Sequence, residues 1–232
     1  MKIYSLIIVC LITLFSSCNN KSKNNAISEG QIVFNIKYSK ALTKNWSFIL
    51  PKNMTMSFKD NKYKIETSAR GFMNSSLISD CNKKQLIMTL EMGLNKIYAV
   101  LDEKTTNEML DLYPEYEIVK SNLKEKIISY PCNIYYGVFE NIDDGKDVTL
   151  YSTNDIEIKE SNWCNQFKDV DGLLLKYQAN QFGIDMTFTA DTLYSNISIA
   201  DSIFDIPAKF KKVEYRVFIK EMEDLSSSLI GK

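Results

Sequence analysis

Hydrophobic and polar residues alternate along much of this chain with the two-residue period of a β-strand. In the segment 31–38, the apolar face carries Ile32, Phe34, Ile36 and Tyr38. The longest regular alternation covers 184–191, with apolar positions at Ile184, Met186, Phe188 and Ala190. Successive side chains of a strand point to opposite faces of the sheet, so both segments predict strands with one face in a hydrophobic core.

Turn signals divide much of the remaining chain into further short strands. Met54, Met56 and Phe58 precede the pair Asp60-Asn61 and the alternating segment 63–67, and this order predicts a hairpin. Further strands are expected at 71–79, 86–90, 97–101, 117–120, 125–130, 133–140, 148–152, 173–177 and 213–220. The unbroken apolar run 97–101 is typical of a central strand.

Segments that lack this alternation are expected to form short helices or loops. The sequence predicts a short helix or wide loop over 41–50, a helix over 107–112, and a short closing helix over 221–229. Thr105 and Thr106 are candidate N-caps for the helix over 107–112.

The mixed segment 154–171 has Trp163 and Phe167 as its expected anchors. No internal repeat or linker divides the chain, so one domain is expected over 30–232. The sequence therefore predicts a single, mainly β domain, largely antiparallel, with a few short helices.

The chain begins with the features of an export signal. Lys2 precedes the largely apolar run 3–15, which is too short to span a bilayer. Residues 14–18 resemble the lipobox of bacterial lipoproteins, in which the cysteine is acylated, although Phe15 stands where leucine is usual. We therefore expect a signal peptide over 1–17 and lipid attachment at Cys18. The alternative is an ordinary cysteine just past a secretory cleavage site.

The residues that follow the expected anchor are polar and lack an apolar period. They predict a flexible tether over 18–29. No aspartate follows Cys18, which resembles the outer-membrane sorting pattern of lipoproteins. We expect a protein of the cell envelope whose acyl chains hold it to the membrane. The sorting pattern implies the outer membrane, with the domain facing the periplasm.

Composition excludes several classes of function. The chain of 232 residues has 28 basic and 29 acidic residues, a net charge of −1, so no long-range field attracts nucleic acid. It contains no histidine, which excludes Ser-His-Asp and Cys-His catalysis and histidine-based zinc sites. We expect no metal and no cofactor.

The cysteines and one acidic turn leave narrower alternatives. Beyond the signal and Cys18, the chain keeps Cys81, Cys132 and Cys164, which allow at most one internal disulfide. We expect three buried thiols, and the alternative is a Cys132–Cys164 pair. The segment 143–146 predicts a hairpin turn rather than a calcium site, because its two carboxylates are too few.

Several short motifs resemble DUF4412-type exported lipoproteins. They are the segments 172–177, 186–190 and 202–212, together with 30–34, 130–132 and 150–156. Part of the chain also resembles GLPGLI-type exported proteins, although the second glycine-containing half of that motif is absent. The ending Phe204-x-Ile206-Pro207 is similar to that of the LolA/LppX lipoprotein-carrier superfamily.

This resemblance implies a half-open β-barrel, in which one strongly curved antiparallel sheet has helices over its concave face. It implies an apolar cavity that holds a lipid or an acyl chain, with covers from the segments 41–50, 105–112 and 154–168. The candidate cavity residues are Phe34, Ile36, Met54, Met56, Phe58, Met88, Leu175, Tyr177, Met186 and Phe188. An ordinary filled core requires the same residue pattern, so this alternative stays open.

We therefore expect a lipid-anchored, non-enzymatic protein that binds a hydrophobic ligand. The alternative is a structural or protein-interaction module of the envelope with a filled core. An enzyme would need paired carboxylates or a Ser-Lys arrangement, but turns and solvated strand faces account better for Asp169, Asp171, Asp185 and Asp191. A cavity of roughly 300 Å³ or more would favour ligand binding. The oligomeric state is left open.

Overall fold

The computed structural model describes residues 26–39, 50–71, 73–113, 115–139, 147–181 and 184–230. Within these residues, twelve strands form one sheet in the order β12-β6-β5-β4-β3-β2-β1-β11-β10-β9-β8-β7. The strands are β1 Glu29–Tyr38, β2 Asn53–Lys59, β3 Lys62–Ala69, β4 Met73–Asp80, β5 Gln85–Met92, β6 Asn95–Leu101, β7 Tyr116–Ile127, β8 Tyr130–Phe139, β9 Val148–Thr153, β10 Leu173–Gln181, β11 Ile184–Tyr194 and β12 Lys211–Lys212.

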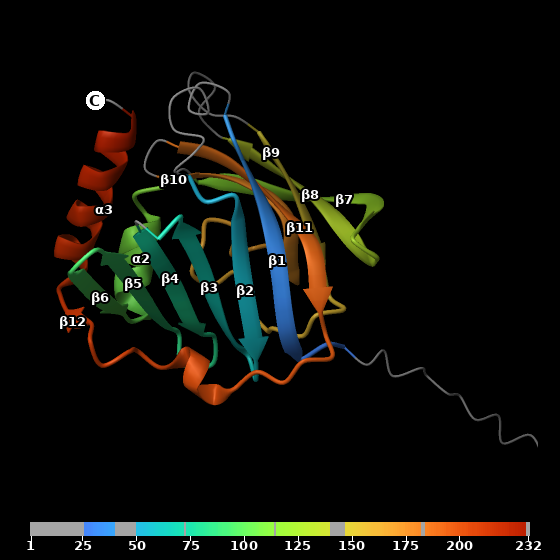
Figure 1. Ribbon diagram of the computed structural model, residues 1–232. Helices are drawn as coiled ribbons and strands as arrows, with labels where there is room; N and C mark the ends of the chain where they lie inside the picture. Colours follow the sequence, from blue (N-terminus) through green and yellow to red (C-terminus); the bar gives the residue numbers. More distant parts are fainter. Residues whose placement is uncertain are drawn as a thin grey trace, which may run out of the picture.

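The sheet is strongly curved, and α2 (Glu103–Leu110) and α3 (Tyr215–Ile230) lie at its β6 end (Figure 1). All neighbouring strands are antiparallel except β12, which pairs in parallel with β6. The first strand, β1, lies between β2 and the late strand β11, so the two ends of the strand sequence meet in the middle of the sheet. The prediction of a mainly β fold with one curved antiparallel sheet and a few short helices is confirmed.

The hairpin β2–β3 shows how local sequence sets the register. Asp60 and Asn61 have φ angles of 49° and 63°, which place both turn residues in the left-handed region. Asp and Asn tolerate this region better than most residues, and two such residues form the tight turn that matches the twist of a hairpin. The turn places Phe58 opposite Tyr63, and the predicted hairpin is confirmed.

The register aligns inward-facing side chains into rows that cross β1 to β6. The floor row consists of Gly30, Phe58, Tyr63, Ser79, Leu86 and Leu101. The middle row consists of Ile32, Met56, Ile65, Leu77, Met88 and Ala99. The upper row consists of Phe34, Met54, Thr67, Ser75, Leu90 and Ile97.

The C-terminal region differs from the prediction. The expected strand over 213–220 is wrong, because α3 begins at Tyr215 and runs for 16 residues. Val213, Tyr215, Val217 and Ile219 alternate as a strand would, but Val217 is exposed, and the residues of α3 that pack against the core are Tyr215, Phe218, Ile219 and Met222. Relative to Tyr215, the other three follow at three, four and seven residues, which fits one face of a helix.

Two further expectations about β6 and α2 are corrected. The run 97–101 is not a central strand, since β6 borders only β5 and the two-residue β12. Its apolar character reflects packing against α2 and α3. The helix α2 begins at Glu103, and its N-cap is Asp102, whose carboxylate accepts a hydrogen bond from the Thr105 backbone N–H at 2.8 Å. Neither threonine is the cap.

The remaining differences are local. The two expected strands 117–120 and 125–130 form the single strand β7 with an irregularity between Lys120 and Lys124. The segment 154–171 forms consecutive turns rather than a helix, and Trp163 and Phe167 are buried in it as expected. The expected signal peptide, Cys18, the turn 143–146 and, apart from Leu50, the segment 41–50 lie outside the described residues. Among the described helices, none has the length and apolar character needed to cross a membrane.

Candidate ligand-binding cavity

A cavity of about 330 Å³ lies between the inner face of the sheet and the segments that cover it. Its walls come from β1 to β5, β10 and β11, and its covers are α2, α3 and the turns around 161–167. On β1 to β5, the middle and upper rows supply most of the lining side chains, because the pleat turns every second residue towards this side. The volume exceeds the 300 Å³ that the sequence analysis set as the lower bound for ligand binding.

Eight of the ten candidate residues line this cavity, namely Phe34, Ile36, Met54, Met56, Met88, Tyr177, Met186 and Phe188. Phe58 and Leu175 do not line it, and both side chains are 0% exposed in the filled part of the interior. The ring of Phe58 packs over Gly30, where an added Cβ would lie only 3.1 Å from that ring. These two residues are therefore core, while the other eight border the hollow.

Sequence reasoning missed the lining that comes from the helices. Met109, Leu110 and Tyr113 reach the cavity from α2 and the turn after it. Phe218, Ile219 and Met222 reach it from α3. The helical spacing of the α3 residues was the available signal, and the competing two-residue pattern hid it.

Aromatic rings make one wall stiff. The rings of Tyr177 and Phe188 are stacked with centroids 4.8 Å apart, and Phe34 and Phe167 meet Tyr177 edge-on at 6.5 and 6.4 Å. The other walls carry six methionines: Met54, Met56, Met88, Met109, Met186 and Met222. Methionine is unbranched and flexible, so these walls can adapt to the shape of an apolar ligand.

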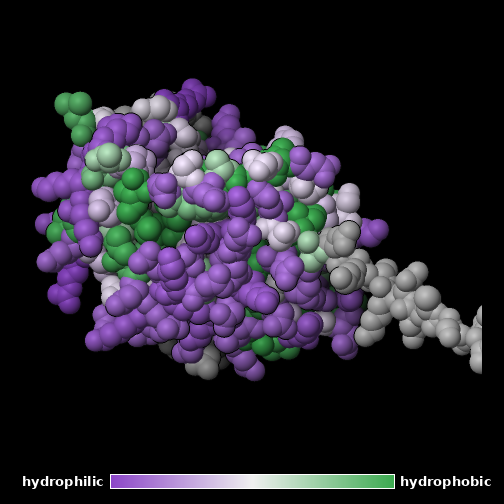
Figure 2. Space-filling view, turned by 90° about the horizontal axis from the view of Figure 1, so that it is seen from below, coloured by the Kyte–Doolittle hydropathy of each residue, from purple (hydrophilic) through white to green (hydrophobic). Residues whose placement is uncertain are grey.

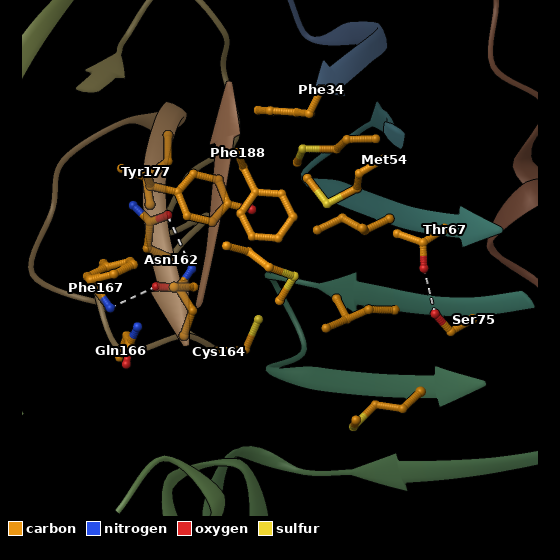
Figure 3. A pocket seen from close by; sticks show the side chains of 18 of the residues that line it. Phe34, Met54, Thr67, Ser75, Asn162, Cys164, Gln166, Phe167, Tyr177 and Phe188 are labelled. Atoms are coloured by element: carbon orange, nitrogen blue, oxygen red, sulfur yellow. Dashed lines mark hydrogen bonds between the residues drawn. The ribbon is translucent and has the colours of Figure 1, made fainter. Parts of the chain in front are cut away.

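The polar groups of the lining are hydroxyls and carboxamides. The hydroxyls of Thr67 and Ser75 lie 2.7 Å apart and form a hydrogen bond across β3 and β4 (Figure 3). Tyr38 donates its hydroxyl to the carbonyl of Pro51 at 2.7 Å. Asn162 is committed to structure, because its Nδ2 donates to the carbonyls of Val170 and Gly172 at 2.8 and 2.9 Å.

The ionisable groups that line the cavity are neutral at pH 7. Burial raises the pKa of Tyr38 to about 12 and raises the pKa of the Tyr177 hydroxyl and the Cys164 thiol. Burial, followed by the nearby Glu223 carboxylate, raises the pKa of Tyr113. The pKa of Tyr63 is raised well above its usual value, chiefly by burial. Desolvation disfavours the charged form of each group.

A buried hydrogen-bond network closes the floor of the cavity. Tyr63 Oη lies 3.0 Å from both the Ser161 carbonyl and Cys164 Sγ. Trp163 Nε1 donates to Ser79 Oγ at 2.8 Å. These contacts fix the covering turns to the floor row. The expected thiols are found, since Cys81, Cys132 and Cys164 are all buried and free, and the alternative Cys132–Cys164 pair is not formed.

The described part of the chain offers no paired carboxylates or metal cluster inside the cavity. None of Asp169, Asp171, Asp185 and Asp191 lines it. Asp191 accepts a hydrogen bond from Asn35 at 3.0 Å, and Asp185 accepts one from Asn180 at 2.7 Å, both at exposed positions. No group of three or more potential metal ligands occurs among the described residues.

The outer surface contrasts with this interior. The face in Figure 2 is largely hydrophilic, with hydrophobic side chains gathered towards one side. A more open groove of about 890 Å³ lies between the outer face of the sheet and the segment 205–210. Four of its charged side chains are paired with one another, Lys64 with Glu66 at 2.8 Å and Lys209 with Glu91 at 4.0 Å. The inner cavity is therefore the stronger candidate for a hydrophobic ligand.

Comparisons with known proteins support the fold alone. No family model matches the sequence, and no curated protein matches it. The structure is similar to solved structures of PNGF-II in two crystal forms, with TM-scores of 0.54 and 0.53 and 13% sequence identity. The match covers 86% and 85% of this chain but 34% and 33% of those chains, so this chain spans about a third of their length. The resemblance to DUF4412-type and LolA-like proteins stays a prediction.

Proposed function

We propose that this protein binds a hydrophobic ligand, a lipid or an acyl chain, in the cavity on the inner face of its sheet. The observation that carries this proposal is the hollow itself, about 330 Å³ and lined chiefly by aromatic, methionine and aliphatic side chains. A cavity of this kind binds an apolar molecule favourably, because burial removes the ligand's apolar surface from water. The polar groups of the lining are hydroxyls and carboxamides, which can orient a ligand by hydrogen-bonding to its polar end.

The beginning of the sequence supports a location for this binding. An export signal over 1–17 and a cysteine at the lipobox position would give a chain that is anchored through acyl groups on Cys18. We propose that the domain is held in this way at the outer membrane and faces the periplasm. Mass spectrometry of the N-terminal peptide tests the anchor, since an unmodified Cys18 would contradict it.

A structural or protein-interaction module of the envelope is the second candidate. The observation that favours it is the buried part of the floor row, in which Phe58 and Leu101 are 0% exposed and do not line the cavity. In this alternative, the hollow would be a packing defect of a stable sheet, and a partner would dock on the outer surface. We propose no enzymatic activity for either candidate.

Native mass spectrometry and lipid extraction test the ligand proposal. The mature chain, residues 18–232 with Cys18→Ser, is purified and examined for copurifying lipid and for uptake of added 1-lauroylglycerol. We expect bound ligand in near-stoichiometric amount. A clean ligand-free mass with no uptake would contradict the proposal and favour the interaction module.

A cavity-filling variant links the binding to this hollow. Ala179 lines the cavity, so Ala179→Phe places a ring in the space that the ligand would occupy. We expect uptake to fall at least tenfold while the chain stays folded. Gln178→Phe is the matched control, because Gln178 is the exposed neighbour on the opposite face of β10. Equal uptake by both variants would place binding elsewhere.

A further inference from the structure

We propose that the cavity selects an uncharged, single-chain ligand: one alkyl or acyl chain that ends in a neutral hydrogen-bonding group such as an ester, amide or hydroxyl. This inference rests on the proposed function and names the chemical class of ligand that the same site accepts. It distinguishes neutral amphiphiles from free fatty acids, whose carboxylates are ionised near neutral pH.

The first support is the charge of the walls. Among the described residues that line the cavity, there is no aspartate, glutamate, lysine or arginine. The ionisable side chains there are Cys164 and four tyrosines, all of which stay neutral at pH 7. An ionised ligand group would lose its hydration and meet no opposite charge, and such burial is strongly unfavourable.

The second support is the sign of the charges just outside the lining. Glu223 on α3 lies close enough to Tyr113 and Tyr215 to help raise the pKa of both hydroxyls, after burial. Asp185, at the start of β11, acts in the same direction on Tyr116, again after burial. Both groups are carboxylates, so they repel an anionic headgroup. Lys84, a cation that acts on the lining residue Cys164, is itself paired with Glu160 at 2.5 Å.

The third support is a neutral polar pair within an otherwise apolar row. Thr67 and Ser75 stand between Met54 and Leu90 in the upper row. In Figure 3, their hydroxyls lie on the other side of Met54 from the Tyr177 and Phe188 rings. Each hydroxyl has one donor and two acceptor positions, so their mutual bond leaves one O–H donor and several acceptor positions free. This pair can satisfy an ester, amide or hydroxyl without any charge.

The volume limits the ligand to one chain. A space of about 330 Å³ holds roughly eleven non-hydrogen atoms if each takes about the 30 Å³ share of a liquid water molecule. This size fits about ten carbons of one chain with the polar end at the Thr67–Ser75 pair, so the glycerol of a probe such as 1-lauroylglycerol extends beyond the enclosed space. It does not fit the two chains of a diacyl lipid.

A matched ligand series tests the charge selection on the mature chain carrying Cys18→Ser. The probes are 1-lauroylglycerol, laurate and dodecylamine, which share a twelve-carbon chain and differ in charge at pH 8. Binding is measured by native mass spectrometry and titration calorimetry, below the concentration at which each probe forms micelles. We expect 1-lauroylglycerol to bind at least roughly tenfold more tightly than either charged probe, because only the charged ends lose hydration unpaired.

The pH dependence of laurate sharpens the test. An ordinary carboxyl has a pKa of about 4.3, so laurate becomes neutral as the pH falls below that range. We expect its affinity to approach that of 1-lauroylglycerol at about pH 4, while the affinity of 1-lauroylglycerol, measured in parallel, stays unchanged.

A charge-introducing variant should reverse the selection. Thr67→Lys places an ammonium group beside the proposed polar end, and we expect laurate to bind at least roughly tenfold more tightly than in the parent chain at pH 8. Ser75→Lys is a second variant for the case that the first does not fold. Asn74→Lys is the matched control, because Asn74 is exposed on the outer face of β4, the strand that also carries Ser75. Circular dichroism establishes that each variant is folded.

The outcomes separate this inference from the proposed function. Equal binding of laurate and 1-lauroylglycerol at pH 8, or preferred binding of dodecylamine, overturns the charge selection and leaves a hydrophobic-ligand protein. Failure of all three probes to bind overturns the proposed function itself. An unchanged laurate affinity in a folded Thr67→Lys or Ser75→Lys variant overturns the assignment of the polar end.

Discussion

The floor row and the middle row cross the same strands only two residues apart, yet four of the six middle-row residues border the cavity, against two of the six in the floor row, Tyr63 and Leu86. Phe58, Leu86 and Leu101 of the floor row are 0% exposed. Ile65, Leu77 and Met88 of the middle row stay partly accessible and line the cavity. The floor row is covered by turns that hydrogen-bond to it through Tyr63 and Ser79.

Strand alternation therefore decides which face of the sheet is apolar, but not whether side chains fill the space over that face. Both rows follow the same two-residue period and both are rich in large apolar side chains. The covering segments decide the outcome: the turns at 161–164 hydrogen-bond to the floor row, while α2 and α3 contribute side chains such as Met109 and Phe218 to the lining of the cavity. Variants that affect one row and leave the other intact test this difference in packing.

The largest effect is expected from truncating the floor row. Phe58→Ala should lower the free energy of unfolding by about 3–5 kcal/mol, because it removes a fully buried ring and leaves a cavity that its neighbours cannot fill. Chemical denaturation measures the change. A cost below about 1 kcal/mol would show that the floor row is not a packed core.

Alkaline pH should destabilise the filled part of the interior. Burial raises the pKa of the Cys81 and Cys132 thiols to about 11 from 9.0. The folded chain therefore keeps protons that the unfolded chain releases between pH 9 and 11, so stability is full below pH 9 and falls as the pH rises. We expect a loss on the order of 2 kcal/mol for each thiol, measured by denaturation from pH 8 to 11.

The control for this pH effect is the double variant Cys81→Ala and Cys132→Ala. It should be less stable at pH 8, and its loss of stability between pH 9 and 11 should be smaller than that of the parent chain by the contribution of the two thiols, while Cys164 and the buried tyrosines keep theirs. An equally steep fall in the double variant would assign the pH effect to other groups.

Removal of a hydroxyl should distinguish Ser79 of the floor row from Ser75 of the upper row, which borders the hollow. Ser79→Ala leaves the indole N–H of Trp163 buried without its acceptor and should cost about 1–3 kcal/mol. Ser75→Ala removes a hydroxyl that borders the hollow, where water can replace it, and should cost less than about 1 kcal/mol. Equal costs in denaturation experiments would mean that Ser75 is as dry as Ser79.

The smallest effect is expected from truncating the cavity wall. Met88 already borders empty space, so Met88→Ala removes few packed contacts and should cost only about 1 kcal/mol. The variant enlarges the hollow and should increase the affinity for chains longer than twelve carbons relative to 1-lauroylglycerol. A loss as large as that of Phe58→Ala would show that the middle row is packed in solution.

Much of the sheet could be predicted because its signals are local. The left-handed pair Asp60-Asn61 and the alternation on both sides of it specify the β2–β3 hairpin. The C-terminal helix could not be predicted in the same way, since Val213, Tyr215, Val217 and Ile219 satisfy a strand period while Phe218 and Met222 satisfy a helical one. The contact of α3 with β6 decides between the two.

The residues of the candidate site also fall into those that local sequence predicts and those that it does not. Strand residues such as Met54 and Phe188 could be assigned to the inner face from alternation alone. Phe58 and Leu175 satisfy the same pattern, and nothing in the local sequence separates them from the cavity residues. Met109 and Phe218 reach the hollow from distant elements, so their contribution depends on how the chain returns over the sheet.

By itself, the sequence determined a mainly β chain, the inner face of its strands, the absence of histidine chemistry, and an N-terminal pattern typical of an anchored exported protein. Only the tertiary structure decided that β1 pairs with β11, that Phe58 and Leu101 of the floor row are buried away from the cavity, and that the described lining residues of the hollow include no charged side chain. The physical reason is that alternation is a property of neighbouring residues. Filling depends on volumes that segments far apart in the chain bring to the same place.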